Sequence, residues 1–552
     1  MRLVGTPIAT PSRRSSDGPA AASPPRPTWS RLAGPVANVG VPLVLLALVF
    51  LLYGDALHYA FMYDDGLDLA RGEHRDVLSL LTSGEGAFYY RPLPFLAWKG
   101  LHALLGRYDL FWFHLPPLLL HAANACLLYW LARGLRLGTG TAFLAAGLFV
   151  VFPFHYQVVP WAGAVFHPLV TAFVLTALLT YRWGRLHDSA GWLSVSLGCT
   201  LLALLTHEYA VTLGVLVAGM ELWLWRSGQV STWRPYALLY FGLAAVYLLW
   251  WASVPKWPRT YSLDTESLWR NALMFLQAGL WPITIGWRSA PPALLERPEF
   301  SLAVLGGLVV PLLGWLFWRA RALSWLTLAV VWLGITALPV WATLSWEYLE
   351  DGARLYYLPG VGIAIGWAAL TRLLAAHGWQ RRAGQVALAA LYAWAVWQSL
   401  GFLAARASMY EEGTRLLRDA AAASAAAPAS AELLYVNFPA WKAPREPAFP
   451  LGNTGVTFVP EYVLLGQALH VNGGGPAAVT SRASRAVPPG WPDHYGPHGH
   501  WASEEELREA AGSATASYVV RYRPDGPRLE PWTASWREEL PSPRADGAYN
   551  PR

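Results

Sequence analysis

Two adjacent aspartates, Asp64 and Asp65, are the residues of this 552-residue sequence whose type and position best suit chemistry. They follow the first long apolar run, and the aromatic residues Phe61 and Tyr63 precede them. Charged groups beside a bilayer are costly unless they reach water or serve a function. Partial burial among apolar groups makes a carboxylate a better base. We therefore interpret one of the two aspartates as a catalytic base, although a solvated loop or a helix cap would also account for the pair.

Two arginines could bind an anion near these carboxylates. Arg354 begins the sequence Arg-Leu-Tyr-Tyr-Leu-Pro at the start of an apolar run, and Arg91 lies in Tyr-Arg-Pro-Leu. The fork of a guanidinium group matches the oxygens of a phosphate. A salt bridge or a lipid headgroup contact is the alternative for either side chain. We expect Arg354 to be the better candidate for phosphate binding.

Other polar residues cluster at the ends of the apolar runs. The spacing of the histidines and acidic residues matches no metal-ligand motif, so we expect no metal site and favour hydrogen bonding within the protein. No cofactor is certain, and a divalent metal is not indicated. The weaker candidates for a substrate pocket are Tyr90, His155, Gln157, His207, Glu208 and Tyr357.

The elements that must position these residues are membrane spans. Hydrophobic residues make up 55% of the chain and charged residues 14%, with a mean hydropathy of +0.30. Soluble globular proteins carry about 25% charged residues. Apolar runs of roughly 18 residues recur, which is the length that crosses hydrocarbon. This composition excludes a soluble architecture and predicts an all-α polytopic membrane protein. The net charge of +6 does not indicate nucleic-acid binding, because the arginines are spread over short linkers.

The linker arginines indicate which way each linker faces. They fall in alternate linkers, and positive charge marks the cytoplasmic side of a membrane protein. With about eleven spans, the pattern predicts a multi-pass plasma-membrane protein with its N-terminus in the cytoplasm and its C-terminus outside. The candidate residues then share the outer side. The apolar runs lie near residues 36–53, 110–131, 139–154, 167–182, 191–206, 209–225, 235–252, 300–318, 323–342, 355–371 and 384–403.

The sequence predicts three parts. Residues 1–34, rich in Pro, Ser, Ala and Arg, are expected to form a disordered cytoplasmic tail. Residues 35–404 form the transmembrane domain, and its outer loop 54–109 contains the two aspartates. Residues 405–552 are expected to form a small extracytoplasmic α/β domain.

The last part carries a few local signals. Strand-like runs occupy 432–438 and 516–523, and Ser503 with Glu506 forms a capping-box pattern that predicts a helix start. Residues 493–500 are rich in histidine, glycine and proline, and we expect an exposed loop there and not a metal site.

The order of these motifs resembles the GT-C superfamily of integral membrane glycosyltransferases. More narrowly, it resembles the protein O-mannosyltransferases and the transmembrane-and-tetratricopeptide O-mannosyltransferases, without their repeats. The similarity covers roughly residues 35–375, and the order of its motifs is more specific than any one of them. Those motifs are the acidic pair, YRPL at 90–93, Phe113-His114 with His121 and Asn124, FPFH at 152–155, THE at 206–208 and RLYYLPGVG at 354–362.

The resemblance implies an inverting transfer of a sugar, for example mannose, from a polyprenyl-phosphate donor to an extracytoplasmic protein or glycan acceptor. It implies that Asp64 is the base, with Asp65 as its support or alternate, and that Arg354 holds the lipid phosphate, with Arg91 as a second phosphate binder. A base takes the proton of the attacking hydroxyl, and a fixed cation stabilises the leaving phosphate.

This chain lacks several charges that relatives carry. Those relatives have acidic residues where it has Gln157 and Ala353, a lysine where it has His207, and Arg-Ser-Asp near residues 165–167. The lost charges leave a non-catalytic GT-C-like transporter or lipid-binding envelope scaffold as an alternative. A transporter should show inverted repeats with broken helices in matching halves, and we see no such pairing. A membrane anchor whose outer domain binds envelope partners is a further alternative.

Overall fold

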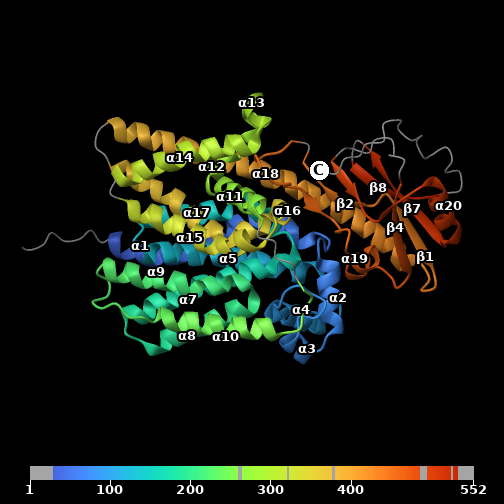
Figure 1. Cartoon of the computed structure of the whole chain (residues 1–552), viewed down its shortest axis with the longest axis horizontal. Helices are drawn as coiled ribbons and strands as arrows, with labels where there is room; N and C mark the ends of the chain where they lie inside the picture. The colour runs from blue at the N-terminus through green and yellow to red at the C-terminus, as the bar shows by residue number, and fades with distance from the viewer. Residues whose placement is uncertain are drawn as a thin grey trace, which may run out of the picture.

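The computed structural model describes residues 29–258, 264–319, 322–375, 379–444, 446–484, 494–523 and 526–532. A helical bundle and a smaller sheet-containing domain are joined by one long helix, α18 (Trp379–Ala426), which runs out of the bundle and along the second domain (Figure 1). Residues 1–28 of the predicted tail lie outside the described part. Helix α1 starts at Trp29, so the end of that tail is helical and not disordered, as the run Trp-Ser-Arg-Leu-Ala permits.

Each apolar run predicted from the sequence coincides with a helix. The periodic apolar residues therefore located the helices correctly, and the differences are a few residues at the ends. The helices are α1 (Trp29–Tyr53), α5 (Leu110–Gly134), α6 (Thr139–Val150), α7 (Phe166–Leu186), α8 (Ala190–Thr206), α9 (Leu213–Arg226), α10 (Ala237–Ser253), α14 (Pro298–Arg319), α15 (Leu323–Thr343), α17 (Tyr357–Ala369) and α18.

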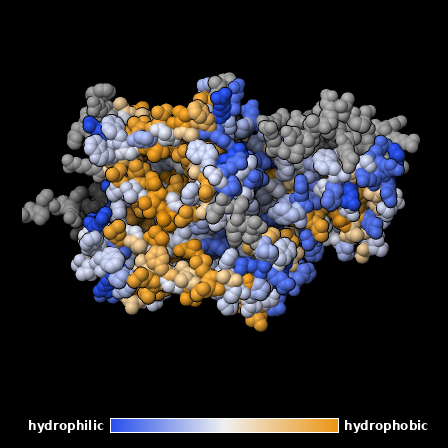
Figure 2. All heavy atoms as spheres, viewed as in Figure 1, coloured by the Kyte–Doolittle hydropathy of each residue, from blue (hydrophilic) through white to orange (hydrophobic). Residues whose placement is uncertain are grey.

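The outer surface of the bundle is apolar. Within the described residues, seven helices are long enough and apolar enough to cross a membrane, and three further apolar helices have 10–17 residues. Large side chains point outward from them, for example Leu249, which is 74% exposed, and Leu308, which is 68% exposed. Figure 2 shows that hydrophobic residues, drawn in orange, are concentrated on the face of the bundle in view. An apolar surface of this extent requires a lipid environment, so the protein is an integral membrane protein.

Helix α17 forms the centre of the bundle. Its residues from Tyr357 to Ile365 are all buried, as expected for a helix that is apolar on every face. It packs against α15 closely, since Gly362 lies where any added Cβ would come within 2.7 Å of the Trp332 ring. The indole of Trp332 also donates a hydrogen bond to the carbonyl of Leu358, at 3.0 Å. These contacts fix the start of α17 and, with it, Arg354 just upstream.

The segments that carry the candidate residues fold into short helices at one end of the bundle. The predicted loop 54–109 contains α2 (Asp65–His74), α3 (Val77–Thr82) and α4 (Pro92–Leu105). The linker between α10 and α14 contains α11 (Thr265–Gly279) and α12 (Trp281–Thr284), and α16 (Trp346–Glu350) follows α15. Short 3-10 turns complete this end, at Pro153–Gln157, Ala162–Val165, Glu208–Thr212 and Ala353–Tyr356.

The C-terminal domain is α/β. Its five-stranded sheet has the order β6-β4-β1-β7-β8, parallel except for the β7–β8 pair, and a second sheet has the order β3-β2-β5. The two predicted strands are confirmed as β1 (Glu432–Val436) and β7 (Ala516–Arg523). The predicted capping box of Ser503 and Glu506 is present at the start of α20 (Glu504–Ser513). The other elements are β2 (Pro439–Lys442), β3 (Val456–Thr457), α19 (Leu465–Val471), β4 (Ala478–Ser484), β5 (Tyr495–Pro497), β6 (His500–Ala502) and β8 (Gly526–Pro531).

Two features of this domain differ from the expectation. The domain boundary placed near residue 404 falls inside α18, whose polar second half packs on the sheet domain through a hydrogen bond from Tyr435 to the carbonyl of Ala420, at 2.9 Å. Residue 493 of the tract 493–500 lies outside the described residues, and the rest is not an exposed loop, because β5 pairs with β2 and His498 is buried. The Nε2 atom of His498 lies 2.9 Å from the carbonyl oxygen of Val463. Glycine and proline in the tract concealed this pairing from the sequence pattern.

Candidate active site

The two aspartates have different environments. Asp65 is 1% exposed, and its carboxylate accepts hydrogen bonds from the indole of Trp161 at 2.9 Å and from the backbone N–H of Met62 at 3.2 Å. Gly163 lies so close that a Cβ there would come within 2.4 Å of the Asp65 carboxylate. Burial raises the pKa of Asp65 well above its usual value, and the nearby charges of Asp68 and Asp64 act in the same direction. Asp65 is thus enclosed by protein and holds the adjoining segments together.

Asp64 is accessible. It precedes α2, and its backbone carbonyl accepts the N–H groups of Leu67 and Asp68, but its side chain makes no capping hydrogen bond. That side chain instead accepts a hydrogen bond from the hydroxyl of Tyr462 in the C-terminal domain. Since the carboxylate is partly exposed and does not cap the helix, it is the member of the pair that a substrate can reach.

The backbone just before Asp64 is strained. Tyr63 has a φ of 52°, a left-handed conformation that non-glycine residues rarely adopt and that costs about 1–3 kcal/mol. Its ring stacks on Trp161 with centroids 4.5 Å apart, and both side chains are buried. A strained backbone conformation of this kind persists only where the surrounding contacts hold it in place. The stack of Tyr63 on Trp161 therefore fixes the direction in which the Asp64 side chain leaves the backbone.

Arg354 keeps its positive charge available. Its backbone N–H and its Nη1 donate to the Oε1 of Gln157, at 2.9 and 3.3 Å, and its Nη2 donates to the hydroxyl of Tyr348 at 2.8 Å. The guanidinium lies 5.4 Å from the Trp161 ring and 5.1 Å from the Tyr348 ring. Within the described residues, none of these partners is a carboxylate in ion-pair contact. The geometry therefore leaves a guanidinium that can bind an anion.

Arg91 is paired. Its guanidinium contacts the Glu208 carboxylate at 2.9 and 3.0 Å and lies 4.5 Å from the Tyr89 ring and 5.2 Å from the Phe166 ring. The ring nitrogen Nδ1 of His207 is 3.2 Å from the same carboxylate. Glu208 thus compensates the charge of Arg91, which makes Arg91 a weaker anion site than Arg354.

These residues belong to one site. The charges of Asp64 and Arg354 lie close enough to interact, and the charges of both arginines reach His207. Trp161 links the two sides of the site, because it donates to Asp65 and lies under Arg354. The linkers predicted to share the outer side of the membrane therefore meet in space. Chemically, the site combines an accessible proton acceptor with a cation that, among the described residues, has no carboxylate in ion-pair contact.

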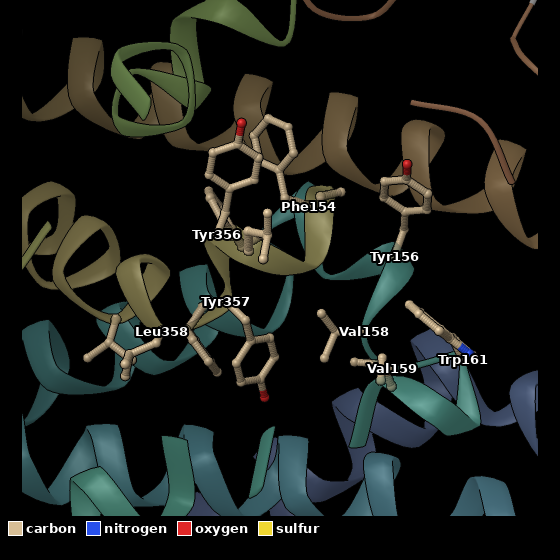
Figure 3. Packing of buried hydrophobic residues seen from close by; sticks show 14 of the residues in the cluster. Phe154, Tyr156, Val158, Val159, Trp161, Tyr356, Tyr357 and Leu358 are labelled. Carbon is tan, nitrogen blue, oxygen red and sulfur yellow. The ribbon is translucent and has the colours of Figure 1, made fainter. Parts of the chain in front are cut away.

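Three of the sequence candidates lie elsewhere. Tyr90 donates to the carbonyl of Leu81 at 2.5 Å and accepts a hydrogen bond from the indole of Trp250 at 3.3 Å. His155 and Tyr357 lie inside the bundle, where their rings pack 4.4 Å apart and the Tyr357 hydroxyl is 2.8 Å from His121. Figure 3 shows Tyr357 and the adjacent Tyr356 pointing to opposite sides of their segment. Gln157 and Glu208, in contrast, contact Arg354 and Arg91 directly, and His207 contacts Glu208.

Two tyrosines of the site were not predicted. Tyr348 lies six residues before Arg354 in an acidic outer linker, a position that could have suggested it. Tyr462 lies in the C-terminal domain, 398 residues from Asp64, and no local pattern marks it. Within the described part of the chain, no group of three or more His, Cys, Asp or Glu residues could hold a metal ion.

Asp68 makes the stability of the folded protein depend on pH. Burial raises its pKa to about 6, although Arg71 beside it acts in the opposite direction. The unfolded chain releases this proton near pH 4, so the folded protein loses up to roughly 3 kcal/mol of stability as the pH rises from about 4 to about 6. Thermal unfolding midpoints in detergent should fall over this window, and Asp68→Asn should make that fall smaller, because only the contribution of Asp65, whose pKa is also raised, then remains.

Glu505→Gln, on the exposed face of α20, serves as the control and should retain the wild-type pH dependence. If Asp68→Asn showed the same fall as the wild type, Asp68 would not be the group that titrates.

Comparisons with known proteins agree with the motifs. No family model matches the chain. A stretch of 190 residues is 33% identical to protein O-mannosyl-transferase Tmtc1 of Drosophila melanogaster, covering 32% of this chain and 22% of that protein. The chain thus matches about a fifth of the length of this relative. The resemblance to O-mannosyltransferases expected from the motifs is confirmed by this match.

Two solved structures are also similar to this chain. One is the arabinofuranosyltransferase AftD from mycobacteria, with 17% identity and a TM-score of 0.38 over 80% of this chain and 31% of that one. A mutant form of AftD gives 16% identity and a TM-score of 0.37, over 80% and 33% of the two chains.

Proposed function

We propose that this chain is a GT-C-type glycosyltransferase of the plasma membrane. It transfers a sugar, for example mannose, from a polyprenyl-phosphate donor to a protein or glycan acceptor outside the cytoplasm. The observation that supports this most is the meeting in one site of an accessible carboxylate, Asp64, and a guanidinium, Arg354, whose described hydrogen-bond partners include no carboxylate. About eleven spans, with the N-terminus inside and the C-terminal domain outside, would place that site at the outer surface.

The proposed reaction is a single displacement. The oxygen of an acceptor hydroxyl attacks the anomeric carbon, and its proton passes to the Asp64 carboxylate. The bond from the anomeric carbon to the phosphate oxygen breaks, and the lipid phosphate leaves with the negative charge that Arg354 stabilises. Because attack and departure occur on opposite faces of the sugar, the anomeric configuration is inverted.

The surrounding residues hold the proposed phosphate ligand, Arg354, and the segment that carries the proposed base, Asp64, in place. Gln157 and Tyr348 hold the Arg354 guanidinium, and Trp161 connects it to Asp65 and the start of α2. The Arg91–Glu208 pair and the Tyr89 ring border the same site and, in this proposal, support the donor. The apolar helices account for the lipid part of the donor, because a polyprenol needs a membrane-embedded enzyme.

The proposal is tested with the purified protein in lipid nanodiscs and a panel of polyprenyl-phosphate sugars. We expect one donor to release polyprenyl phosphate and to give a product of inverted anomeric configuration. Turnover of none of the donors would contradict an enzyme. Binding of a donor without turnover would instead favour the lipid-binding scaffold.

Gln157→Glu tests whether Arg354 must remain without an ion-pair contact in order to bind the donor. A carboxylate at this position would form a charge-assisted ion pair with the guanidinium, since Gln157 Oε1 already accepts from Arg354. It would compete with the donor phosphate, and we expect the donor KM to rise about tenfold, equivalent to about 1.4 kcal/mol.

Gln277→Glu is the matched control. Gln277 is also a buried glutamine, and its amide bonds the backbone of Leu451 at 2.9 and 2.8 Å, outside the site. An unchanged donor KM in Gln157→Glu, or an equal rise in both variants, would show that Gln157 does not govern the charge at Arg354.

A further inference from the structure

The C-terminal domain contributes a residue to the site. The hydroxyl of Tyr462 donates a hydrogen bond to the Asp64 carboxylate, although its residue is 70% exposed. The same hydroxyl lies within electrostatic reach of Tyr348 and Arg354. It therefore occupies a hydrogen-bonding position on the proposed base, on the carboxylate to which an attacking hydroxyl has to give its proton.

The hydroxyl of Tyr462 is suited to donating a hydrogen bond to Asp64, and not to reacting as a nucleophile. Partial desolvation of its hydroxyl at the contact with Asp64 and the negative charge of that carboxylate both raise the pKa of Tyr462, so the phenol stays protonated. A protonated hydroxyl bonded to the carboxylate has the same chemical form as an acceptor alcohol poised for proton transfer. The bond also excludes a water molecule from that oxygen of Asp64.

The backbone that carries Tyr462 is firmly attached to the catalytic segment. Helices α2 and α19 lie against each other at the junction of bundle and sheet domain (Figure 1). The Asn472 side chain bonds both backbone groups of Phe61 at 2.9 Å, and Gly66 lies where an added Cβ would come within 2.8 Å of Ala468. With the backbone held and the side chain largely exposed, rotation of the Tyr462 side chain alone can open the site.

We propose that Tyr462 is a placeholder for the acceptor hydroxyl, and that it keeps water from Asp64 until an acceptor alcohol displaces it. This inference rests on the proposed glycosyltransferase function. Without the placeholder, water would replace the alcohol in the same reaction. Its oxygen would bond to the anomeric carbon, its proton would pass to Asp64, and polyprenyl phosphate would leave, so the donor would be hydrolysed.

The test measures release of free sugar from polyprenyl-phosphate mannose, or from whichever donor of the panel the wild type uses, without an acceptor. Tyr462→Phe removes only the hydroxyl, and Tyr462→Ala removes the ring as well. Both should hydrolyse the donor at least about tenfold faster than the wild type, because a hydrogen bond to a charged group no longer opposes entry of water. Tyr435→Phe is the control, since its hydroxyl bonds Ala420 within the same domain, away from the site.

The outcomes separate the two proposals. Faster hydrolysis by both Tyr462 variants, with the control at the wild-type rate, supports the placeholder. If the wild type turns over a donor but the Tyr462 variants hydrolyse it no faster, the placeholder is wrong and the glycosyltransferase stands. A sugar found on Tyr462 by mass spectrometry would make it an acceptor and would also overturn the inference. Absence of donor turnover in every protein would remove the proposed function itself.

Discussion

Asp64→Asn should lower the rate of sugar transfer by about 10²- to 10⁴-fold, the usual contribution of a general base. Asparagine has the same shape and can still accept the hydrogen bond from Tyr462, so the fold should remain intact. It cannot take a proton from the acceptor hydroxyl. We expect the loss in kcat, measured with the donor identified from the panel, while donor binding stays close to that of the wild type.

Asp55→Asn is the control for this experiment, since Asp55 is an exposed carboxylate in the turn that follows α1. It should transfer sugar at the wild-type rate. Transfer by Asp64→Asn within a few-fold of the wild type would contradict the assignment of Asp64 as the base. Asp65→Asn would then become the next variant to measure, although the Asp65 carboxylate is enclosed by Trp161 and Met62.

Arg354→Gln should cost about 10²- to 10³-fold in kcat, because the cation that stabilises the leaving phosphate is lost. Donor affinity should fall as well, since the same cation binds the phosphate in the ground state. Arg354→Lys should recover only part of the rate, because a lysine supplies a charge but not the planar fork that matches phosphate oxygens. Rates and donor dissociation constants of the three proteins provide the comparison.

Arg107→Gln controls for the loss of a positive charge at the same end of the bundle. Arg107 is exposed and pairs with Asp109 at 2.9 Å, remote from the Gln157–Tyr348 cradle of Arg354. Its kcat and donor affinity should not change. Equal losses in the Arg107 and Arg354 variants would mean that overall charge matters and not a phosphate site at Arg354.

The sequence was most informative where one physical constraint acts over many residues. The lipid environment forces long apolar helices, so each run from 36–53 to 384–403 predicted a helix that the structure contains. The arginine alternation assigned Asp64, Arg91 and Arg354 to the same side, and the structure brings them into one site. Their convergence could be predicted because short linkers between packed helices can only meet at one end or the other.

The sequence was least informative where a single long-range contact decides a role. The residue types alone did not decide between Asp64 and Asp65, and only the family resemblance favoured Asp64, because the packing of Trp161 and Gly163 that encloses Asp65 is a long-range contact. Gln157 was interpreted from the sequence as a lost charge, whereas the structure shows its amide oxygen holding Arg354 without neutralising it. Tyr462 could not be found, because its role depends on how a separate domain docks on α2.

The C-terminal domain shows the same limit. Alternating apolar residues predicted β1 and β7, and a capping box predicted the start of α20. The short strands β5 and β6 lie in a segment rich in glycine, proline and histidine, whose local preferences favour turns. Their pairing with β2 and β4 comes from tertiary contacts, which local sequence does not encode.

The central claim is that Asp64 and Arg354 act on one polyprenyl-phosphate sugar. A cryo-EM structure with a non-hydrolysable polyprenyl-phosphonate sugar tests it most directly. The account predicts phosphonate oxygens about 3 Å from the Arg354 guanidinium, with the anomeric carbon on the side of Asp64 and the Tyr462 hydroxyl. A phosphonate bound at the arginines of the opposite end of the bundle, or a sugar directed away from Asp64, would contradict it.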